Sequence, residues 1–317
     1  MRRLGISLQI LTFLNPRISL DFNSLDISSY PSYDELYGAL SKKYGVSFEM
    51  MEFFNGGSSA IFSLFSHLKL QKCVIYSPAY LEYKKAAHIF GYETQLINRF
   101  KNIYESVEKS SLVIFVNPST PDGKVYDIEA LFKSWVEADA TVLVDESFLD
   151  FTPHESVTKY LKEYEKLYIL KSLTKFYSSA GIRVGLILSN EKNIATIKKS
   201  EPLWKISQFD SYYIQEALKD SEFEKITKSV TDENREYLVS ELFSHEVVEK
   251  VHESCANYIL IKLKNMSAQK LQEILNEEKI MIRDCSNFDF LDESHVRVAV
   301  KSKESIDKFL RVLEGCK

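Results

Sequence analysis

The stretch SLTKFYSSAGIRVG (residues 172–185) places one lysine among hydroxyl-bearing and small apolar residues, with an arginine eight positions later. The apolar runs KLYIL (166–170) before it and RVGLIL (183–188) after it have the composition of buried strands. We therefore expect Lys175 at the end of a buried strand, where burial lowers the pKa of its amine. Such a lysine is a candidate Schiff-base nucleophile, and the alternative is a buried lysine whose amine reaches a carbonyl or solvent.

Length and composition are those of a globular protein. The 317 residues, 45% of them hydrophobic, suffice for a large core and for two domains. The net charge of −5 offers no basic field for a nucleic-acid backbone. The four cysteines show neither a CxxC pair nor a zinc-like spacing, which predicts free thiols, no metal and a cytoplasmic location. The N-terminus imitates a signal peptide but lacks a small-residue cleavage site, and no run reaches membrane-spanning length, so we expect no membrane partner.

Short apolar runs alternate with amphipathic segments in the first two thirds of the chain. Val/Ile/Leu runs at this spacing predict an α/β fold, a mostly parallel sheet with helices on both faces. The segment 30–46 is predicted to be a helix, with Ser32 as N-cap and Glu35 completing a capping box. The predicted strands are CVIYS (73–77), LVIFVN (112–117), TVLVDE (141–146), LYILKS (167–172) and RVGLIL (183–188).

The pattern changes after about residue 190. A long charged helical region precedes three short apolar runs, and this order predicts a separate, smaller α+β domain. We place the large domain at residues 31–225 and form the small domain from residues 226–317 together with residues 1–30. The elements expected in the small domain are the runs 256–263, 280–285 and 295–300, a helix near 267–278 and a closing helix.

Polar residues stand where the predicted strands end. Asn117 follows one strand, Asp145 the next, and Lys175 the third, while Arg183 begins a fourth. Each residue alone has an ordinary explanation as a turn or a cap. Ligands of open α/β sheets bind outside the carboxyl ends of the strands, so together these groups predict a binding site at one sheet edge.

A second motif, FNGGSSAIF (54–62), runs two glycines and two serines into a helical stretch. Backbone N–H groups at such a helix start bind phosphate. Pyridoxal phosphate needs a lysine for its aldehyde, a carboxylate for its ring nitrogen and an anion site for its phosphate. We therefore predict pyridoxal 5'-phosphate as the cofactor, with Lys175 as the Schiff-base lysine and Ser172, Thr174 and Arg183 as phosphate ligands.

These motifs resemble the fold-type I pyridoxal-phosphate enzymes of the aminotransferase class I/II superfamily. NPSTPDGKV (117–125) is similar to their Asn-Pro-x-x-Pro-x-Gly element, VDESFLDF (144–151) to their Asp-Glu-x-(Tyr/Phe) element, and residues 172–185 to their lysine segment. The phrases DESFLDFTPHES (145–156) and IRDCSNFDFLD (282–292) are similar to the branch of histidinol-phosphate aminotransferase and L-threonine-phosphate decarboxylase.

For the cofactor, the resemblance implies that Asp145 pairs with the pyridine nitrogen and that Asn117 bonds the ring hydroxyl. It implies that Tyr83 stacks on the ring, with a core position as the alternative. Tyr30 would reach the phosphate of the neighbouring subunit, with a hydrophobic staple as the alternative. The other implied phosphate contacts are Gly57, Ser58 and Ser59.

For the substrate, the resemblance implies that Arg297 takes the carboxylate, a bidentate task suited to arginine. Arg283 would be a second anion contact, or else an ordinary surface pair. Asn15, in the Asn-Pro near the N-terminus, is expected on the substrate side. The role of Tyr30 implies a homodimer with shared active sites.

The implied function is an aminotransferase acting on a small amino acid, phosphorylated or not. Phe148 stands where many aminotransferases carry tyrosine, as it does in the decarboxylase, whereas the N-terminal His-Gly-Gly element of the decarboxylase is absent. The alternative is therefore an O-phospho-amino-acid decarboxylase. A third reading is a non-catalytic cofactor-binding protein, against which the intact Lys175, Asp145 and Arg183 argue.

Overall fold

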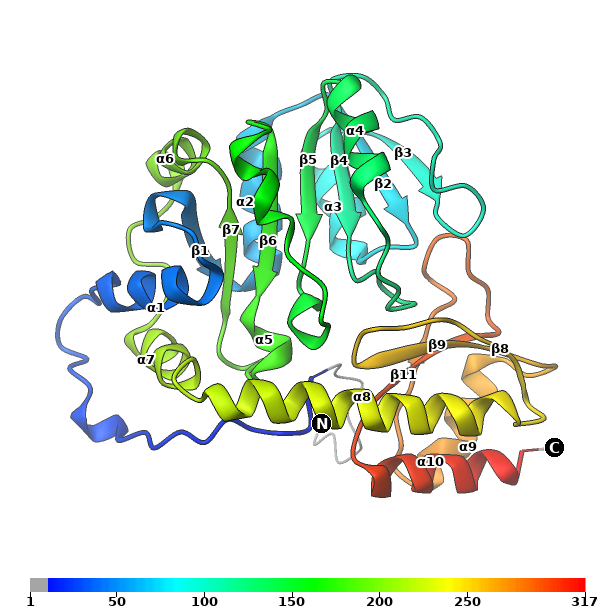
Figure 1. Cartoon of the computed structure of the whole chain (residues 1–317). Coiled ribbons are helices and arrows are strands. Elements are labelled where there is room, and N and C mark those ends of the chain that lie inside the picture. Colours follow the sequence, from blue (N-terminus) through cyan, green and yellow to red (C-terminus); the bar gives the residue numbers. More distant parts are fainter. Residues whose placement is uncertain (1–10, 317) are drawn as a thin grey trace.

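The computed structural model describes residues 11–316 and contains a seven-stranded sheet with a separate four-stranded sheet beside it (Figure 1). The strand order of the large sheet is β1-β7-β6-β5-β4-β2-β3. Neighbours among β2 to β6 pair in parallel, whereas β7 runs antiparallel to both β6 and β1. This confirms the predicted α/β fold with a mostly parallel sheet. The strands are β1 (Met51–Asn55), β2 (Lys72–Ser77), β3 (Glu93–Asn98), β4 (Leu112–Val116), β5 (Thr141–Asp145), β6 (Leu167–Ser172) and β7 (Val184–Leu188).

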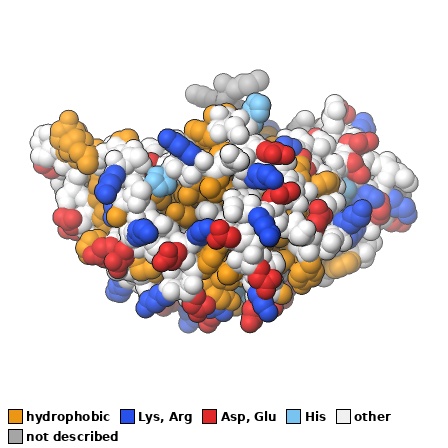
Figure 2. Space-filling view, turned by 90° about the horizontal axis from the view of Figure 1, so that it is seen from above, with side chains coloured by type: hydrophobic (Ala, Val, Ile, Leu, Met, Phe, Trp, Pro, Cys, Tyr) orange, Lys and Arg blue, Asp and Glu red, His pale blue; other side chains and the backbone are white. Residues whose placement is uncertain are grey.

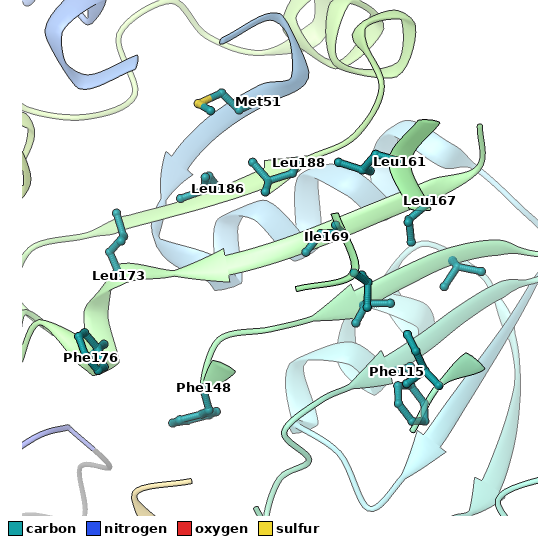
Figure 3. Packing of buried hydrophobic residues seen from close by; sticks show 14 of the residues in the cluster. Met51, Phe115, Phe148, Leu161, Leu167, Ile169, Leu173, Phe176, Leu186 and Leu188 are labelled. Atoms are coloured by element: carbon teal, nitrogen blue, oxygen red, sulfur yellow. The ribbon is translucent and has the colours of Figure 1, made fainter. Parts of the chain in front are cut away.

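Helices cover both faces of the large sheet. Side chains of α2, α3 and α6 form the core on one face, and those of α1, α4 and α7 form it on the other. Figure 3 shows the core on the face covered by α1, α4 and α7, in which Met51, Ile169 and Leu186 lie close together. Because both faces are covered, a strand such as β4 is buried along its whole length. These helices are α1 (Asp34–Tyr44), α2 (Gly56–Leu68), α3 (Leu81–Ile89), α4 (Glu129–Glu137), α5 (Leu173–Phe176), α6 (Glu191–Ser200) and α7 (Gln208–Ala217), with 3-10 turns η1 (Phe22–Ser24), η2 (Phe48–Met50), η3 (Leu149–Phe151) and η4 (Val157–Lys162).

The small sheet is antiparallel, with the strand order β10-β11-β9-β8, and this confirms the predicted smaller α+β unit. The long helix α8 (Ser221–Phe243) extends from the side of the large sheet to the small one (Figure 1). It crosses the predicted boundary after residue 225, and the division into two domains stays a prediction. The remaining elements are β8 (Val248–Val251), β9 (Tyr258–Leu263), α9 (Ala268–Glu277), β10 (Arg283–Asp284), β11 (His295–Ala299) and α10 (Lys303–Glu314).

Polar side chains cap the starts of several helices. The prediction for α1 is wrong in this respect, because α1 begins at Asp34 after Tyr33, which makes no side-chain cap hydrogen bond. The helix start lies two residues beyond Ser32, so the Ser32 hydroxyl donates to the Asp34 carboxylate at 3.0 Å instead. N-cap side chains that accept from the backbone N–H three residues later are those of Asn190, Ser207, Asp220, Ser267 and Ser302.

The segment before α1 makes hydrogen bonds to residues beside both sheets. The Thr12 N–H donates to the Lys175 carbonyl at 3.2 Å, beside the large sheet. The Lys301 amine, after β11 of the small sheet, donates to the Leu11 carbonyl at 3.0 Å. The union of residues 1–30 with the small domain therefore stays a prediction. The segment that imitates a signal peptide lies mostly outside the described residues.

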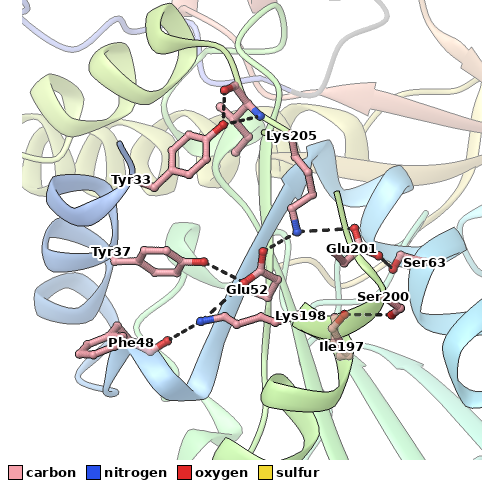
Figure 4. A network of polar contacts seen from close by, with 11 residues as sticks. Tyr33, Tyr37, Phe48, Glu52, Ser63, Ile197, Lys198, Ser200, Glu201 and Lys205 are labelled. Carbon is pink, nitrogen blue, oxygen red and sulfur yellow. Dashed lines mark hydrogen bonds and ion pairs between the residues drawn. The ribbon is translucent and has the colours of Figure 1, made fainter. Parts of the chain in front are cut away.

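A buried carboxylate on β1 holds the loop between α6 and α7 (Figure 4). Glu52 is 4% exposed and accepts a hydrogen bond from the Tyr37 hydroxyl at 2.8 Å. The same carboxylate forms an ion pair with Lys205 in the loop, and its distance to the Lys198 amine is 3.7 Å. Since these partners come from α1, α6 and the loop, the network fixes the loop against the large sheet.

The surface bears charges of both signs. On the face shown in Figure 2, lysines and arginines are interspersed with aspartates and glutamates rather than gathered in one patch. Among residues 11–316, no helix combines the length and the apolar character needed to cross a bilayer.

The buried ion pair between Lys171 and Glu146 generates a stability prediction. Both side chains are at most 4% exposed, and Glu146 also accepts hydrogen bonds from the Ser156 hydroxyl at 2.6 Å and the Val157 N–H at 2.8 Å. Lys171→Met leaves a buried carboxylate without its cation, so it should lower the free energy of unfolding by about 3–5 kcal/mol. The double variant Lys171→Met/Glu146→Gln should recover part of this loss in urea unfolding, and a double variant less stable than the single one would contradict the explanation.

Candidate active site

The sheet topology brings the predicted groups to one edge. Asp145 ends β5, and Lys175 lies in α5 directly after β6. Because β7 runs antiparallel to β6, Arg183 before its first residue lies at the same edge. Strand β1 runs opposite to β7, so its carboxyl end and the start of α2 meet there too. The edge opens into a cavity of about 820 Å³, counting its mouth, lined by Gly57, Ser58, Ile61, Tyr80, Val116, Thr120, Asp145, Ser147, Phe148, Leu170, Ser172, Thr174, Lys175, Arg183 and Arg297.

Lys175 is the amine of this cavity. Burial lowers the pKa of Lys175, the neighbouring Arg183 and Arg297 guanidinium groups lower it further, and Asp145 opposes the shift. A larger fraction of the amine is therefore neutral near pH 7 than for an exposed lysine. A neutral amine is what nucleophilic attack on a carbonyl requires.

Asp145 is the carboxylate of the cavity and is held in place by two neighbours. Its Oδ2 accepts from the Tyr83 hydroxyl at 2.6 Å, and its Oδ1 accepts from the Ser147 N–H at 2.9 Å. Burial raises the pKa of Asp145, while the hydrogen bonds from Ser147 and Tyr83 oppose the shift. A carboxylate fixed in a low-dielectric cavity suits a cationic partner such as a protonated ring nitrogen.

Donors for an anion gather around the first turn of α2. Gly57 and Ser58 lie in this turn, whose backbone N–H groups have no partner within the helix. The Ser172 and Thr174 hydroxyls lie 2.9 Å apart beside it, and Arg183 lines the same end of the cavity. Backbone donors, hydroxyls and a guanidinium together match a phosphate group.

Arg297 enters the cavity from β11 of the small sheet. Its Nη1 donates to the Thr120 hydroxyl at 3.0 Å, and its guanidinium carbon lies 5.1 Å from the centre of the Tyr258 ring. Burial lowers the pKa of Arg297, and its Nε has no hydrogen-bond partner in the described part of the chain. A buried guanidinium with unused donors is suited to a carboxylate ligand.

Tyr83 and Asn117, two predicted cofactor contacts, lie behind the cavity wall. Tyr80 and Thr120, each three positions away in the sequence, line the wall instead. Tyr83 is fully buried and bonded to Asp145, whereas Tyr80 lines the cavity with its hydroxyl 3.3 Å from that of Ser58. The Asn117 amide both donates to and accepts from the backbone of Tyr126, at 3.1 and 2.9 Å. Thr120, from the same predicted motif, lines the cavity in its place.

The remaining predicted contacts lie outside the lining of the cavity. The Ser59 hydroxyl donates to the Asn55 carbonyl at 2.8 Å, within the first turn of α2. Arg283 lies opposite Arg297 in the β10–β11 pair and bonds Asn287 at 2.9 Å. Asn15 and Tyr30, also predicted site residues, lie outside the lining as well, and both are exposed in this single chain. The Tyr30 ring stacks on the Trp204 ring, with 3.9 Å between ring centres.

Tyr80, Thr120 and Ser147 were not predicted, although each lies close in sequence to a predicted site residue. The segment SPAYLEY (77–83) contains both Tyr80 and Tyr83, and only the start of α3 after Tyr80 decides that this tyrosine faces the cavity while Tyr83 turns inward. The hydroxyls of Thr120 and Ser147 follow strand ends by a few residues. A position just beyond the carboxyl end of a predicted strand was the sequence signal that could have identified these two residues.

The lowered pKa of Lys175 generates a prediction about its reactivity. Reductive methylation of Lys175, followed by peptide mass spectrometry, should show a midpoint below the ordinary lysine value of 10.5, because only the neutral amine reacts. Arg183→Gln removes a cationic neighbour and should raise this midpoint, whereas the control Arg17→Gln, on the exposed N-terminal segment, should leave it unchanged. An unchanged midpoint in Arg183→Gln would contradict the assigned contribution of Arg183 to the lowered pKa of Lys175.

This chain is similar in fold to a protein of known structure and in sequence to two further relatives. The histidinol-phosphate aminotransferase from Clostridium acetobutylicum has a TM-score of 0.84 and 29% identity over 92% of this chain and 91% of that one. A histidinol-phosphate aminotransferase of Flavobacterium psychrophilum is 27% identical over 320 residues, which cover 96% of this chain and 91% of the relative. A provisionally named threonine-phosphate decarboxylase of Caldanaerobacter subterraneus subsp. tengcongensis is 28% identical over 312 residues, 92% of this chain and 84% of the relative.

These relatives come from the branch that the motifs predicted. The family model for aminotransferase class I and II matches residues 18–313, a range that contains every strand of both sheets. This chain is therefore an enzyme of the aminotransferase class I and II family.

Proposed function

We propose that this protein is a pyridoxal-phosphate-dependent aminotransferase acting on a small α-amino acid. The observation that carries the proposal is that Lys175, Asp145 and Arg297 line one cavity together with an anion site at the start of α2. The family supports the same reaction class, since the relatives include histidinol-phosphate aminotransferases. A protein that only binds the cofactor would not need the guanidinium of Arg297, which lies at the side of the cavity away from the anion site.

The residues of the cavity fit pyridoxal phosphate. The first turn of α2, Ser172, Thr174 and Arg183 would hold its phosphate, Asp145 its ring nitrogen and Lys175 its aldehyde. When bound, the cofactor supplies an electron-withdrawing ring that stabilises negative charge at the α-carbon of an amino acid. The raised pKa of Asp145 reflects its burial, and a cationic ring nitrogen would provide the missing counter-charge.

The chain's own groups would then act on the substrate. Arg297 would bind the carboxylate through its guanidinium, which lines the cavity, and orient the α-carbon. The Lys175 amine would accept the proton from the α-carbon as a general base and return it as a general acid, tasks that suit a lysine with a lowered pKa. Phe148 and Val116 in the cavity wall would limit the access of water.

Decarboxylation of an O-phospho-amino acid is the second candidate. Arg283 and Arg297 are direct partners on neighbouring strands, and neither forms an ion pair with a carboxylate in the described part of the chain. Like charges at such positions repel, and a substrate with a second anionic group that reaches Arg283 beyond the cavity lining would relieve this repulsion. Phe148 in the cavity wall and the relative named as a threonine-phosphate decarboxylase support this candidate as well.

We propose a homodimer whose subunits share active sites. Tyr30 is 75% exposed and stacks on Trp204, which is 51% exposed in the loop held by Glu52. Leu203 beside it is also exposed, so this side of the chain presents an apolar surface. A second copy seated there would bury this surface and could receive the Tyr30 hydroxyl at its phosphate site.

We also place the protein in the cytoplasm. All four cysteines are free thiols, three of them buried, as expected in a reducing compartment.

Lys175→Ala tests the cofactor and the reaction together. The purified variant should show no visible absorbance band with pyridoxal phosphate and should lose turnover by roughly three orders of magnitude, because the amine both binds the aldehyde and moves the proton. Threonine phosphate and small unphosphorylated α-amino acids are the first substrates to try, and a keto acid product indicates transamination while carbon dioxide indicates decarboxylation. Wild-type protein without a band would refute the proposal.

Trp204→Glu tests the proposed dimer. A carboxylate at this apolar surface should convert the dimer into a monomer, measured as a halved mass by light scattering coupled to gel filtration. The matched control is Phe243→Glu, which changes an equally apolar residue, 70% exposed, at the end of α8. A wild-type monomer, or a dimer indifferent to Trp204→Glu, would contradict this assembly.

A further inference from the structure

Strand β7 passes directly beneath the first turn of α2 at one glycine. Gly185 pairs with Phe54 on β1 and with Ser172 on β6, so it lies between the strand that leads into α2 and the strand that carries the hydroxyls. Arg183 stands two residues before it. The three parts of the anion site therefore meet around one position that has no side chain.

The absence of a side chain at Gly185 is a steric requirement. A Cβ atom there would lie 2.5 Å from the Gly57 nitrogen and 2.8 Å from the Gly56 carbonyl carbon. These are backbone atoms of the helix, which cannot swing aside as the end of a flexible side chain does. Such contacts below 3.0 Å essentially never occur, so the first turn of α2 would have to move by at least 0.5 Å.

A second glycine makes room on the other side of the same turn. Gly56 has a φ of +82°, and a Cβ atom there would lie 2.4 Å from Nη2 of Arg183 and 2.9 Å from its Cζ. The guanidinium thus rests against the bare Cα of the first residue of α2. Its Nη1 donates to the Ala180 carbonyl at 2.9 Å, which holds it in this place.

We infer that Gly56 and Gly185 are positioning residues of the anion site, because their missing side chains set how closely α2, β7 and Arg183 approach one another. The inference rests on the proposed function, in which the anion is the cofactor phosphate. Neither glycine needs to touch the phosphate. Each fixes the distance between donors that must converge on it.

The spacing matters because hydrogen bonds to an anion are short and directional. Donor–acceptor distances near 2.8 Å are typical of charge-assisted bonds, and they weaken steeply when the donor is displaced. A shift of half an ångström in the first turn moves several N–H groups away from Ser172 and Arg183 at once. The loss should therefore fall on phosphate binding and spare the aldehyde site at Lys175.

The test compares two ligands that differ only in the phosphate. Protein freed of bound cofactor is titrated with pyridoxal phosphate and, separately, with pyridoxal, and the visible absorbance band reports binding to Lys175. In Gly185→Ala and in Gly56→Ala, the affinity for pyridoxal phosphate should fall roughly tenfold or more, while that for pyridoxal changes less than about twofold. The matched control is Gly181→Ala, in the loop between α5 and β7, where an added Cβ meets nothing within 4 Å.

The outcomes separate this inference from the proposed function. Equal losses for both ligands would reveal general damage and overturn the inference, as would an unchanged affinity for pyridoxal phosphate. If neither alanine variant folds, Gly56→Asn decides, because asparagine adopts a positive φ more readily than alanine and its Cβ meets the end of the Arg183 side chain rather than backbone. Wild-type protein that gives no band with either ligand would overturn the proposed function as well.

Discussion

The reversed direction of β7 is the constraint on which the site depends. Inserted between β1 and β6 and antiparallel to both, β7 begins where they end. A parallel strand in this position would have carried Arg183 to the opposite edge of the sheet. With β7 reversed, the Arg183 guanidinium joins the Lys175 amine after β6 and the start of α2 after β1, so groups from three elements meet at one edge of the sheet.

Successive side chains at the ends of β5 and β6 point to opposite faces of the sheet, so residues of the proposed site alternate with those of the buried ion pair. Asp145 and Ser172 face the cavity, whereas their neighbours Glu146 and Lys171 pair with each other away from it. Lys175 and Asp145, on the cavity side, have pKa values shifted in opposite directions by the same cause, which is burial.

Most of the fold could be predicted from the sequence, because buried parallel strands leave near-continuous apolar runs. All five predicted strands of the large sheet are present, while β1 and β3, which are more polar or follow a turn, were missed. Of the predicted site residues, Lys175, Asp145, Arg183 and Arg297 line the cavity, and their roles stay predictions. Tyr83 and Asn117 do not, since a shift of three residues within a motif depends on where a helix or a turn begins, and this is the detail that composition leaves open.

The hydrogen bond between Arg297 and Thr120 joins a strand of the small sheet to a loop of the large one. The groups suited to the cofactor all belong to the large sheet and its helices, whereas the guanidinium suited to the substrate arrives from elsewhere. Under the proposed function, substitutions in β11 and its neighbours would change which substrates bind, while the cofactor contacts on the large sheet would stay in place.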